Sequence, residues 1–329
     1  MIPEIYINSA KQISIQKPLS EEWFDEPILY NQQYIRAIDP DYKQFFTPNE
    51  VRRFGKILKR ALLVSREAMN RKIPDAIITG TGLGCIENTE FFLKDLTFNG
   101  ENLLKPTHFM NSTHNTISSL VAIDAHCHAY NTTYSHKGVS FENALMDAFL
   151  QLKSCKIANA LVGAHDEMTP DYFTLLQRIG YLGNGNFSGE TAVAMLLENM
   201  KNENSLCKIE NVEIFYKNIK SFDKNFLQNI DYVMIGINGN SQNDDIYFEN
   251  SIKLFPKIPL LQFKNIFGES YTSSAFGVYA AAVCLQRGRI AEHLFIDKKD
   301  FSQQKIPRNI LIYNHFENKN HSFVMLSVV

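Results

Sequence analysis

Apolar residues recur along this chain at two spacings. In the segment 141–152 they stand three or four positions apart, which predicts a helix. Helices are also predicted over 47–70 and 273–287. Short continuous apolar runs predict buried strands, at 76–79, 158–162, 232–237, 260–263, 310–314 and 322–328. Because strands and helices alternate in both halves of the chain, the pattern predicts an α/β fold.

The two halves of the chain also repeat one order of elements. A turn of small residues, a buried helix and an apolar strand follow one another at 133–162 and again at 264–314, which hints at internal duplication. We further expect a loop over 23–46. The helix over 47–70 should begin at Thr47, with the carboxylate of Glu50 three positions on, and a buried helix is predicted over 114–129.

Charge and cysteine content narrow the class of protein. The net charge is −2 and the basic residues are scattered, so no polyanionic partner such as nucleic acid is expected. The five cysteines are odd in number and form no CxxC pair, which is typical of free thiols in a reducing compartment. Neither a signal peptide nor a bilayer-spanning stretch is visible, so we expect a cytoplasmic protein without membrane attachment.

One cysteine has a suggestive neighbourhood. Cys127 stands between His126 and His128, which would suit a nucleophile flanked by bases. Within the helix predicted over 114–129, however, it is interpreted as a packed core thiol. The two histidines are two positions apart on that helix and point in different directions, so they do not form a metal-binding pair.

Two other motifs are interpreted as structural. The glycine-rich run 80–84 lacks the Gly-Lys-Ser/Thr ending of a phosphate-binding loop. The pair Asp244-Asp245 opens a predicted helix and favours a helix cap over a metal site. We therefore expect no cofactor and no bound metal.

Four sequence blocks occur together over about residues 75–329. They are 78–84 (ITGTGLG), 109–145 (containing FMNS, HN, NTTYS and SFENAL), 231–244 (beginning DYVMIGINGN) and 264–269 (KNIFGE) with a small-residue helix behind it. In order and spacing they resemble the β-ketoacyl synthase family. The HN block, followed by Thr-Thr-x-Ser and Ser-Phe, resembles the divergent branch that includes chain-length factors of aryl-polyene and flexirubin-type pigment pathways.

This resemblance implies a fold and a degenerate site. The fold is a thiolase-like five-layer αβαβα arrangement of two similar halves, 1–200 and 201–329, in one compact unit. Condensing ketosynthases take the acyl chain on a cysteine at a strained turn before a buried helix, and two histidines assist decarboxylation. The resemblance places Gly138, Asn238 and Glu269 at those three positions. No catalytic role is expected for them.

The remaining positions of the expected site are also informative. Lys264 is retained, and it could form an ion pair with Glu269 that fills the vacated site. Glycine at 138 would tolerate the strained turn but offers no nucleophile. His136, two residues before Gly138, is a possible surrogate acid or base. The family's glycine-rich closing loop is replaced by 314–318 (NHFEN).

The resemblance thus implies a non-condensing subunit, or chain-length factor, that is inactive alone. It would form a heterodimer with a catalytic β-ketoacyl-ACP synthase in fatty-acid or polyketide-type chain elongation, and would meet the acyl carrier protein through that partner. The dimer contact is expected near 131–135. Two alternatives stay open: an acyltransferase or malonyl decarboxylase of the same fold using His136, Glu269 or Lys264, and a homodimeric acyl-binding protein.

Overall fold

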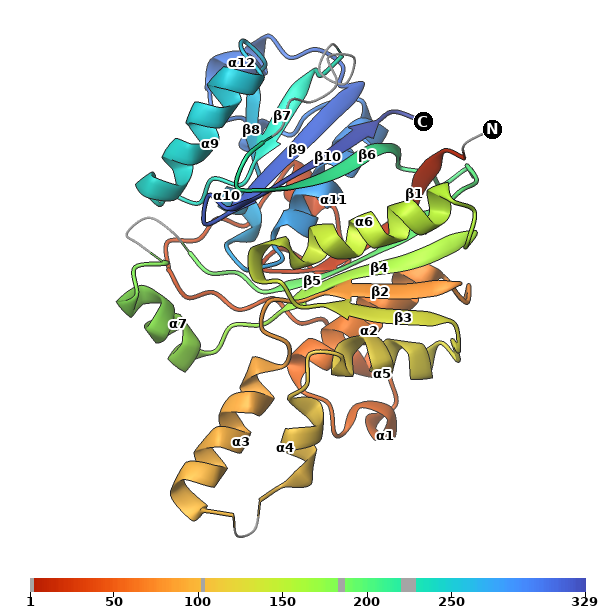
Figure 1. Cartoon of the computed structure of the whole chain (residues 1–329), viewed down its shortest axis with the longest axis vertical. Coiled ribbons are helices and arrows are strands. Elements are labelled where there is room, and N and C mark those ends of the chain that lie inside the picture. Colours follow the sequence, from red (N-terminus) through yellow and green to blue (C-terminus); the bar gives the residue numbers. More distant parts are fainter. Residues whose placement is uncertain (1–2, 102–103, 183–186, 220–228) are drawn as a thin grey trace.

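The protein is built on one large mixed sheet covered by helices (Figure 1). The computed structural model describes residues 3–101, 104–182, 187–219 and 229–329. The strands are β1 (Ile5–Ile13), β2 (Ala76–Gly80), β3 (Tyr130–Tyr134), β4 (Asn159–Asp166), β5 (Thr191–Glu198), β6 (Cys207–Tyr216), β7 (Tyr232–Ile235), β8 (Leu260–Gln262), β9 (Asn309–Phe316) and β10 (Asn320–Ser327).

Helices connect most of these strands. They are α1 (Pro48–Val51), α2 (Lys56–Met69), α3 (Ile86–Asn99), α4 (Pro106–Asn111), α5 (Thr116–Asp124), α6 (Ser140–Lys153), α7 (Pro170–Arg178), α9 (Ser241–Leu254), α10 (Lys264–Phe267), α11 (Ser274–Arg287) and α12 (Lys298–Ser302). A short 3-10 turn, η3 (Lys137–Val139), leads directly into α6.

The strand order of the sheet is symmetric about its centre. It runs β3-β2-β4-β5-β1-β6-β10-β9-β7-β8, so β1 and β6 lie at the centre, and β3 and β8 lie at the edges. In the N-terminal half, β2 pairs in parallel with β3 and β4; in the C-terminal half, β7 pairs in parallel with β8 and β9. The remaining pairs are antiparallel. The halves meet where β1 pairs with β6. Both halves therefore have one topology, as an internal duplication would produce.

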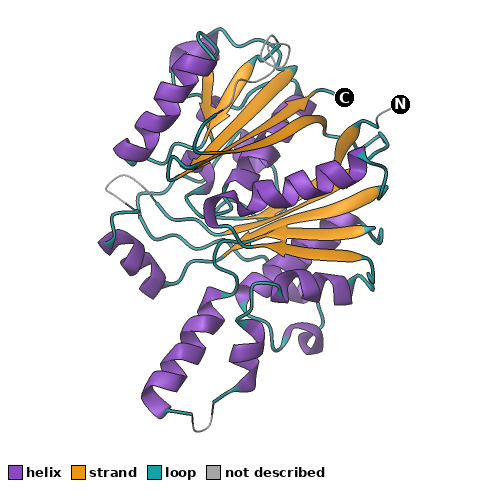
Figure 2. Ribbon diagram, in the orientation of Figure 1, coloured by secondary structure: helices purple, strands orange, loops and turns teal. Residues whose placement is uncertain are grey.

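The helices form three layers around the sheet (Figures 1 and 2). The helices α6 and α11 lie between the two halves of the sheet, whose twisted strands face one another across them. The helices α2 and α5 cover the outer face of the N-terminal half, and α9 covers the outer face of the C-terminal half. This is the five-layer αβαβα arrangement expected from the sequence.

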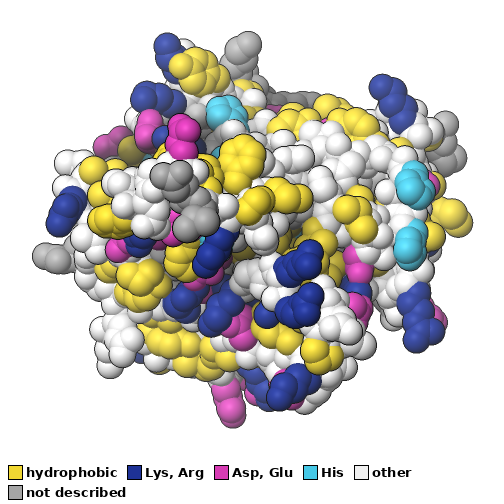
Figure 3. Space-filling model, turned by 90° about the horizontal axis from the view of Figure 1, so that it is seen from below, with side chains coloured by type: hydrophobic (Ala, Val, Ile, Leu, Met, Phe, Trp, Pro, Cys, Tyr) yellow, Lys and Arg dark blue, Asp and Glu magenta, His cyan; other side chains and the backbone are white. Residues whose placement is uncertain are grey.

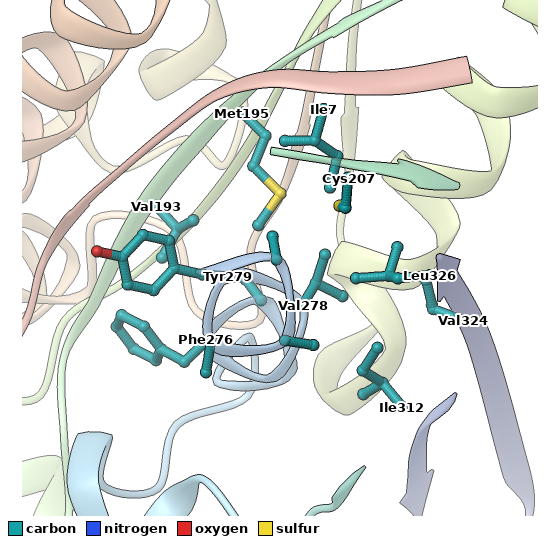
Figure 4. Packing of buried hydrophobic residues seen from close by; sticks show 14 of the residues in the cluster. Ile7, Val193, Met195, Cys207, Phe276, Val278, Tyr279, Ile312, Val324 and Leu326 are labelled. Carbon is teal, nitrogen blue, oxygen red and sulfur yellow. The ribbon is translucent and has the colours of Figure 1, made fainter. Parts of the chain in front are cut away.

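The central helix α11 explains how the layers pack so closely (Figure 4). Its Phe276, Val278 and Tyr279 lie in the core that contains residues of both halves of the sheet. On another side of the helix, a side chain at Gly277 would begin 3.0 Å from the ring of Phe263 and 3.2 Å from Ile312. Small residues at such positions let the helix approach the strands closely.

Most predicted elements are confirmed. The helices predicted at 141–152 and 273–287 are α6 and α11, and the six apolar runs are β2, β4, β7, β8, β9 and β10. Thr47 and Glu50 form the predicted capping box. The sequence interpretation missed β6 and α7. The division of the chain at residue 200 falls between β5 and β6 and stays a prediction.

Two predictions about local structure are wrong. The helix predicted over 47–70 is two helices, separated at 52–55. The helix predicted over 114–129 ends at Asp124, and His126 takes a left-handed backbone with φ of 51°, which places Cys127 outside the helix. The stretch 314–318, which takes the place of the family's closing loop, begins inside β9, and β9 continues to Phe316 before a tight turn leads into β10.

The described helices also bear on membrane attachment. Within residues 3–101, 104–182, 187–219 and 229–329, no helix combines the length and the apolar composition that a bilayer span requires.

Candidate functional site

A cavity of about 460 Å³ lies among segments that are far apart in the sequence. Its walls come from the η3 turn, the loops around 180 and 240, the segment 264–273 and the end of β9. Gly138, Asn238, Lys264 and Glu269 all line it. The structure thus brings together the four positions that the sequence analysis singled out, although 126 residues separate Gly138 from Lys264 along the chain.

Glu269 is the centre of the polar wall. Lys264 Nζ lies 2.8 Å from Glu269 Oε2, and both side chains are less than 10% exposed. Asn238 Nδ2 donates to the same oxygen at 2.7 Å. Because its oxygen already accepts from a cation and an amide, the carboxylate is held in place by neighbours and is not left free to act on a substrate.

Backbone geometry explains the spacing between Lys264 and Glu269. The short helix α10 ends at Gly268, whose φ is 78°. A side chain there would begin 2.8 Å from the backbone of Gly189. Both the left-handed conformation and the close approach require glycine. The Lys-x-x-x-Gly run therefore turns the chain so that residue 269 points back to the lysine.

Asn238 is held by the turn that precedes α9. Asp244 Oδ1 accepts from the backbone N–H of Asn238 at 2.9 Å, and its Oδ2 accepts from that of Gly239 at 2.9 Å. Asn240 is the N-cap of α9 and accepts from the backbone of Asn243. Asp244 thus stabilises the turn before the helix, and no group of three possible metal ligands occurs among the described residues.

Gly138 lies beneath an aromatic ring. A Cβ atom at this position would lie 2.4 Å from Cδ2 of Phe316, which stands at the end of β9. The left-handed residue of the turn is Lys137, with φ of 47°, and not Gly138. Glycine is thus required at 138 for space against Phe316, whereas the sequence interpretation attributed it to the strained backbone. A side chain as large as that of cysteine has no room unless Phe316 moves.

Behind Gly138 lies a buried polar network that sequence reasoning missed. Asn314 Nδ2 donates to the carbonyl of Gly138 at 3.0 Å and to Glu142 Oε1 at 2.7 Å. The hydroxyl of Tyr247 donates to Asn314 Oδ1 at 2.8 Å. Complete burial raises the pKa of Glu142. This network ties the η3 turn to β9 and α9, and it fixes the floor of the cavity.

His315 also lines the cavity and was not singled out from the sequence. Its Nε2 lies 3.1 Å from the carbonyl of Asn243, which can only accept, so Nε2 carries the proton. Burial lowers the pKa of His315 to about 3, and the imidazole is neutral at ordinary pH. The only signal in the sequence was its place in 314–318, the stretch that replaces the family's closing loop.

Comparison with known proteins identifies the family. A family model described as the β-ketoacyl synthase N-terminal domain matches residues 31–228, more than half of the chain. The chain belongs to the β-ketoacyl synthase family. No curated protein sequence matches it.

Solved structures agree with this assignment. The ishigamide ketosynthase/chain length factor superimposes with a TM-score of 0.79 at 13% identity, covering 100% of both chains. A structure of the ketosynthase ApeO in complex with its chain length factor ApeC, from Xenorhabdus doucetiae, gives 0.77 at 13% identity, covering 99% of this chain and 98% of that one. A β-ketoacyl synthase from Burkholderia phymatum STM815 gives 0.76 at 11%, covering 99% and 100%. The thiolase-like α/β fold is thus confirmed.

The other chemical candidates of this ketosynthase-family chain lie outside the cavity. No cysteine is among the described residues that line it. Cys127 is buried elsewhere, with its Sγ 3.2 Å from the carbonyl of Pro74. His136 is exposed, and its Nδ1 lies 3.3 Å from Asn143 Nδ2. The structure therefore does not bring His136 to the carboxylate and lysine of the site.

The glycine-rich turn after β2 is occupied by a carboxylate of the protein itself. Asp166 Oδ1 accepts from the backbone of Gly82 at 2.9 Å and of Leu83 at 3.1 Å. Its Oδ2 accepts from the backbone of Thr272 at 3.0 Å and from its hydroxyl at 2.7 Å. These amides are thus not available to hold a phosphate. Asp166, which the sequence did not single out, ties the turn to the start of α11.

Proposed function

We propose that this protein is a non-condensing ketosynthase-like subunit, a chain-length factor. It would pair with a catalytic β-ketoacyl-ACP synthase in fatty-acid or polyketide-type chain elongation, of the aryl-polyene or flexirubin type. The observation that carries the proposal is Gly138 beneath Phe316 in a cavity whose described lining residues include no cysteine. Ketosynthase chemistry requires a thiolate that accepts the acyl chain, and here neither the thiol nor the space for it is present.

The rest of the cavity supports the same proposal. A condensing site must stabilise an enolate, and positive or neutral donors are suited to that task. Here Glu269 places a carboxylate at the wall, with Asn238 and Lys264 bound to it. Because the carboxylate neutralises the Lys264 ammonium and accepts from Asn238, these two donors are not left to stabilise a malonyl or enolate anion. A subunit that keeps the fold but does not stabilise the reacting anion fits a shaping role better than a catalytic one.

The sheet edge supports pairing with a second subunit. The strand β3 is the last strand on its side of the sheet and has no neighbour beyond it among the described residues. Tyr130 and Asn131 at its start are exposed. An unpaired edge is a template for a strand from another chain. We propose that the ketosynthase subunit pairs here, near 131–135, and contributes the cysteine and both histidines.

In the proposed heterodimer, this chain shapes the tunnel that accommodates the growing acyl chain, and the carrier protein reaches the site through the partner. We also propose that the chain divides into halves at 1–200 and 201–329, since the topology repeats across that point.

An experiment on assembly tests the proposal. The chain is co-expressed with the ketosynthase encoded beside it, and the native mass of the purified complex is measured. We expect a one-to-one heterodimer. A homodimer of this chain, with no ketosynthase bound, would contradict the proposal and favour a homodimeric acyl-binding protein.

A second candidate function uses the polar wall of the cavity. Lys264 and Glu269 do line the cavity, so an acyltransferase or malonyl decarboxylase of the same fold could draw on them. Malonyl decarboxylation or acyl transfer by the isolated chain, lost in Lys264→Met, would establish this alternative.

A further inference from the structure

The cavity beside Gly138 has a wall that is rich in amide groups. Its volume of about 460 Å³ falls within the range of ~300–1,000 Å³ that is usual for small-molecule sites. Amide side chains from three separate segments lie among its described lining residues: Asn238, Asn240, Gln242, Asn243, Asn314 and Asn318. Each amide carries both a donor and an acceptor. A wall of this composition is suited to neutral groups that form hydrogen bonds.

The charges of the wall cancel one another. The Lys264 ammonium is paired with Glu269, and at the rim Glu317 is paired with Lys319. His315, which also lines the cavity, is neutral at ordinary pH because burial lowers its pKa to about 3. On the outer face shown in Figure 3, side chains of both charges likewise lie among apolar ones. Because the charges of the wall cancel, it attracts neither anions nor cations strongly, and an uncharged ligand is favoured.

Groups of the wall keep unused hydrogen-bonding capacity. The Lys264 ammonium has further N–H donors besides the one given to Glu269 Oε2 at 2.8 Å. Among the described residues, Glu269 Oε1 accepts only from the Ser273 hydroxyl, at 3.4 Å. The hydroxyl of Tyr181 has no hydrogen-bond partner within the described part of the chain, and burial raises the pKa of this phenol, so it stays protonated. Spare donors beside spare acceptors suit ligand hydroxyl groups, because a hydroxyl both donates and accepts.

Aromatic rings border this polar wall. Phe316 and Tyr271 both line the cavity, and their rings meet edge to face with centroids 5.9 Å apart. Tyr181 packs against Tyr271 with centroids 5.7 Å apart. The C–H groups of a sugar or polyol pack on aromatic rings, whereas its hydroxyl groups form hydrogen bonds at the edge of the carbon skeleton. A small amide has no comparable apolar face, so the rings favour a hydroxyl-rich carbon skeleton.

The wall is held in place without a ligand. Asp244 accepts from the backbone N–H groups of Asn238 and Gly239, both at 2.9 Å, which fixes the turn before α9. Asn243 Nδ2 donates to Asn238 Oδ1 at 3.2 Å. On the opposite wall, the backbone of Gly268 approaches Gly189 so closely that the chain bearing Glu269 has little freedom. A site that is already formed loses little conformational entropy when a ligand binds.

We infer that this cavity binds a neutral, hydroxyl-rich small molecule, a monosaccharide or a polyol. Its hydroxyl groups bind to the Lys264–Glu269 pair and the hydroxyl of Tyr181, and its carbon skeleton packs against Phe316 and Tyr271. This inference goes beyond the proposed function, because it gives the chain a ligand site of its own where a condensing subunit holds its reacting groups. It does not depend on which subunit the chain pairs with.

Binding is measured on the purified full chain, alone or in the complex with which it co-purifies. The probes are glucose, sorbitol, malonate, choline and acetamide, which separate ring sugar, linear polyol, anion, cation and small amide. We expect glucose or sorbitol to bind with a Kd of about 1 mM or below, and the other three at least about tenfold more weakly. Saturation-transfer NMR measures binding, and the hydroxyl-rich probe that binds should also raise the Tm of the protein.

Two variants test the residues of the wall. Lys264→Met/Glu269→Leu removes the pair without leaving a buried charge unpaired, and it should weaken binding of the hydroxyl-rich probe at least about tenfold. Tyr181→Phe removes a single hydroxyl and should weaken it about threefold to tenfold. Tyr216→Phe is the matched control, because Tyr216 is 65% exposed and is not among the lining residues. It should bind like wild type, and circular dichroism checks that each variant keeps the fold.

The possible results separate the two sources of ligand and the two proposals. Tighter binding of glucose than of sorbitol identifies a ring sugar and the reverse a linear polyol, and both results support the inference. Preference for malonate, choline or acetamide would overturn it, as would wild-type affinity in Lys264→Met/Glu269→Leu or no binding of either hydroxyl-rich probe up to about 50 mM. A chain that binds glucose or sorbitol but pairs with no ketosynthase would contradict the proposed function alone.

Discussion

Phe316 covers Gly138 so closely that position 138 cannot carry a side chain unless the ring of Phe316 moves. The contact joins β9 of the C-terminal half to the turn before α6 in the N-terminal half, and Asn314, two residues before Phe316, binds the carbonyl of the same glycine. A simple exchange of glycine for cysteine therefore does not restore a nucleophile to this site. The absence of a thiol at position 138 and the closure of the site by Phe316 are linked, because the Phe316 ring occupies the space that a side chain at 138 would need.

This contact predicts the effect of restoring the cysteine. Gly138→Cys should lower the free energy of unfolding by about 1–3 kcal/mol, because overpacking forces neighbouring groups to move. In the Phe316→Ala background the same change should cost clearly less, since the obstructing ring is gone. Urea denaturation of the four proteins in this double-mutant cycle measures the coupling. Additive effects would show that Phe316 does not restrict position 138.

The ion pair in the cavity wall gives a second prediction. Glu269→Ala leaves the Lys264 ammonium, which is 8% exposed, without its partner. We expect a loss of about 3 kcal/mol in the free energy of unfolding, whereas Lys264→Met/Glu269→Leu should be close to wild type, since removing both charges removes the desolvation cost. Chemical denaturation compares the proteins. A double variant as unstable as Glu269→Ala would contradict this account of the pair.

Asp166 is expected to be among the most sensitive positions outside the cavity. Asp166→Ala leaves three buried donors without their acceptor: the backbone N–H of Thr272 and the hydroxyls of Thr272 and Thr81. Unsatisfied buried donors cost about 1–3 kcal/mol each, so the variant should lose at least about 3 kcal/mol. Thr272→Val removes only one donor and should cost about 1 kcal/mol. Equal losses in thermal denaturation would argue against this role of Asp166.

Glu167 predicts a pH dependence of stability. Burial raises the pKa of Glu167 to about 8, and only its Oε1 has a partner, the backbone N–H of Glu87. The folded state thus keeps a proton that the unfolded state releases above about pH 4.5, so this group favours folding at low pH and the contribution is lost as the pH rises toward 8.

Glu167→Gln removes this dependence. Relative to wild type, the variant should gain stability between pH 5 and 8, by at most about 1.4 kcal/mol per pH unit. Urea denaturation at both pH values measures the difference, with Glu203→Gln, at an exposed position, as the matched control. A constant difference between Glu167→Gln and wild type would mean that Glu167 is ionised in the folded state throughout this range.

Elements set by a local sequence pattern could be predicted, whereas features that depend on contacts between residues far apart in the chain could not. The α6 and α11 helices were predicted because their apolar spacing is local. The strand β6 was missed since its exposed face is polar and its apolar residues are interrupted. The break after Val51 was missed for a different reason: Gly55, a poor helix former, was taken as helix interior, whereas it is the N-cap of α2.

The residues of the candidate site show the same division between those that a local motif predicts and those that depend on distant contacts. Lys264, Glu269 and Asn238 were found because short motifs resemble a family, and the structure places them together. Asn314 and His315 were missed because their partners, Glu142 and Asn243, lie 172 and 72 residues away in the sequence. The reason for glycine at 138 was wrong because it depends on Phe316, a contact between the two halves that no local pattern contains.

The most direct test of the central claim is to find where the acyl group goes. The co-expressed complex is incubated with an acyl carrier protein that bears a labelled acyl chain, and peptide mass spectrometry locates the label. We predict that it lies on a cysteine of the ketosynthase subunit and that no residue of this chain is acylated. A covalent acyl adduct on this chain, lost when the modified residue alone is replaced, would contradict the account.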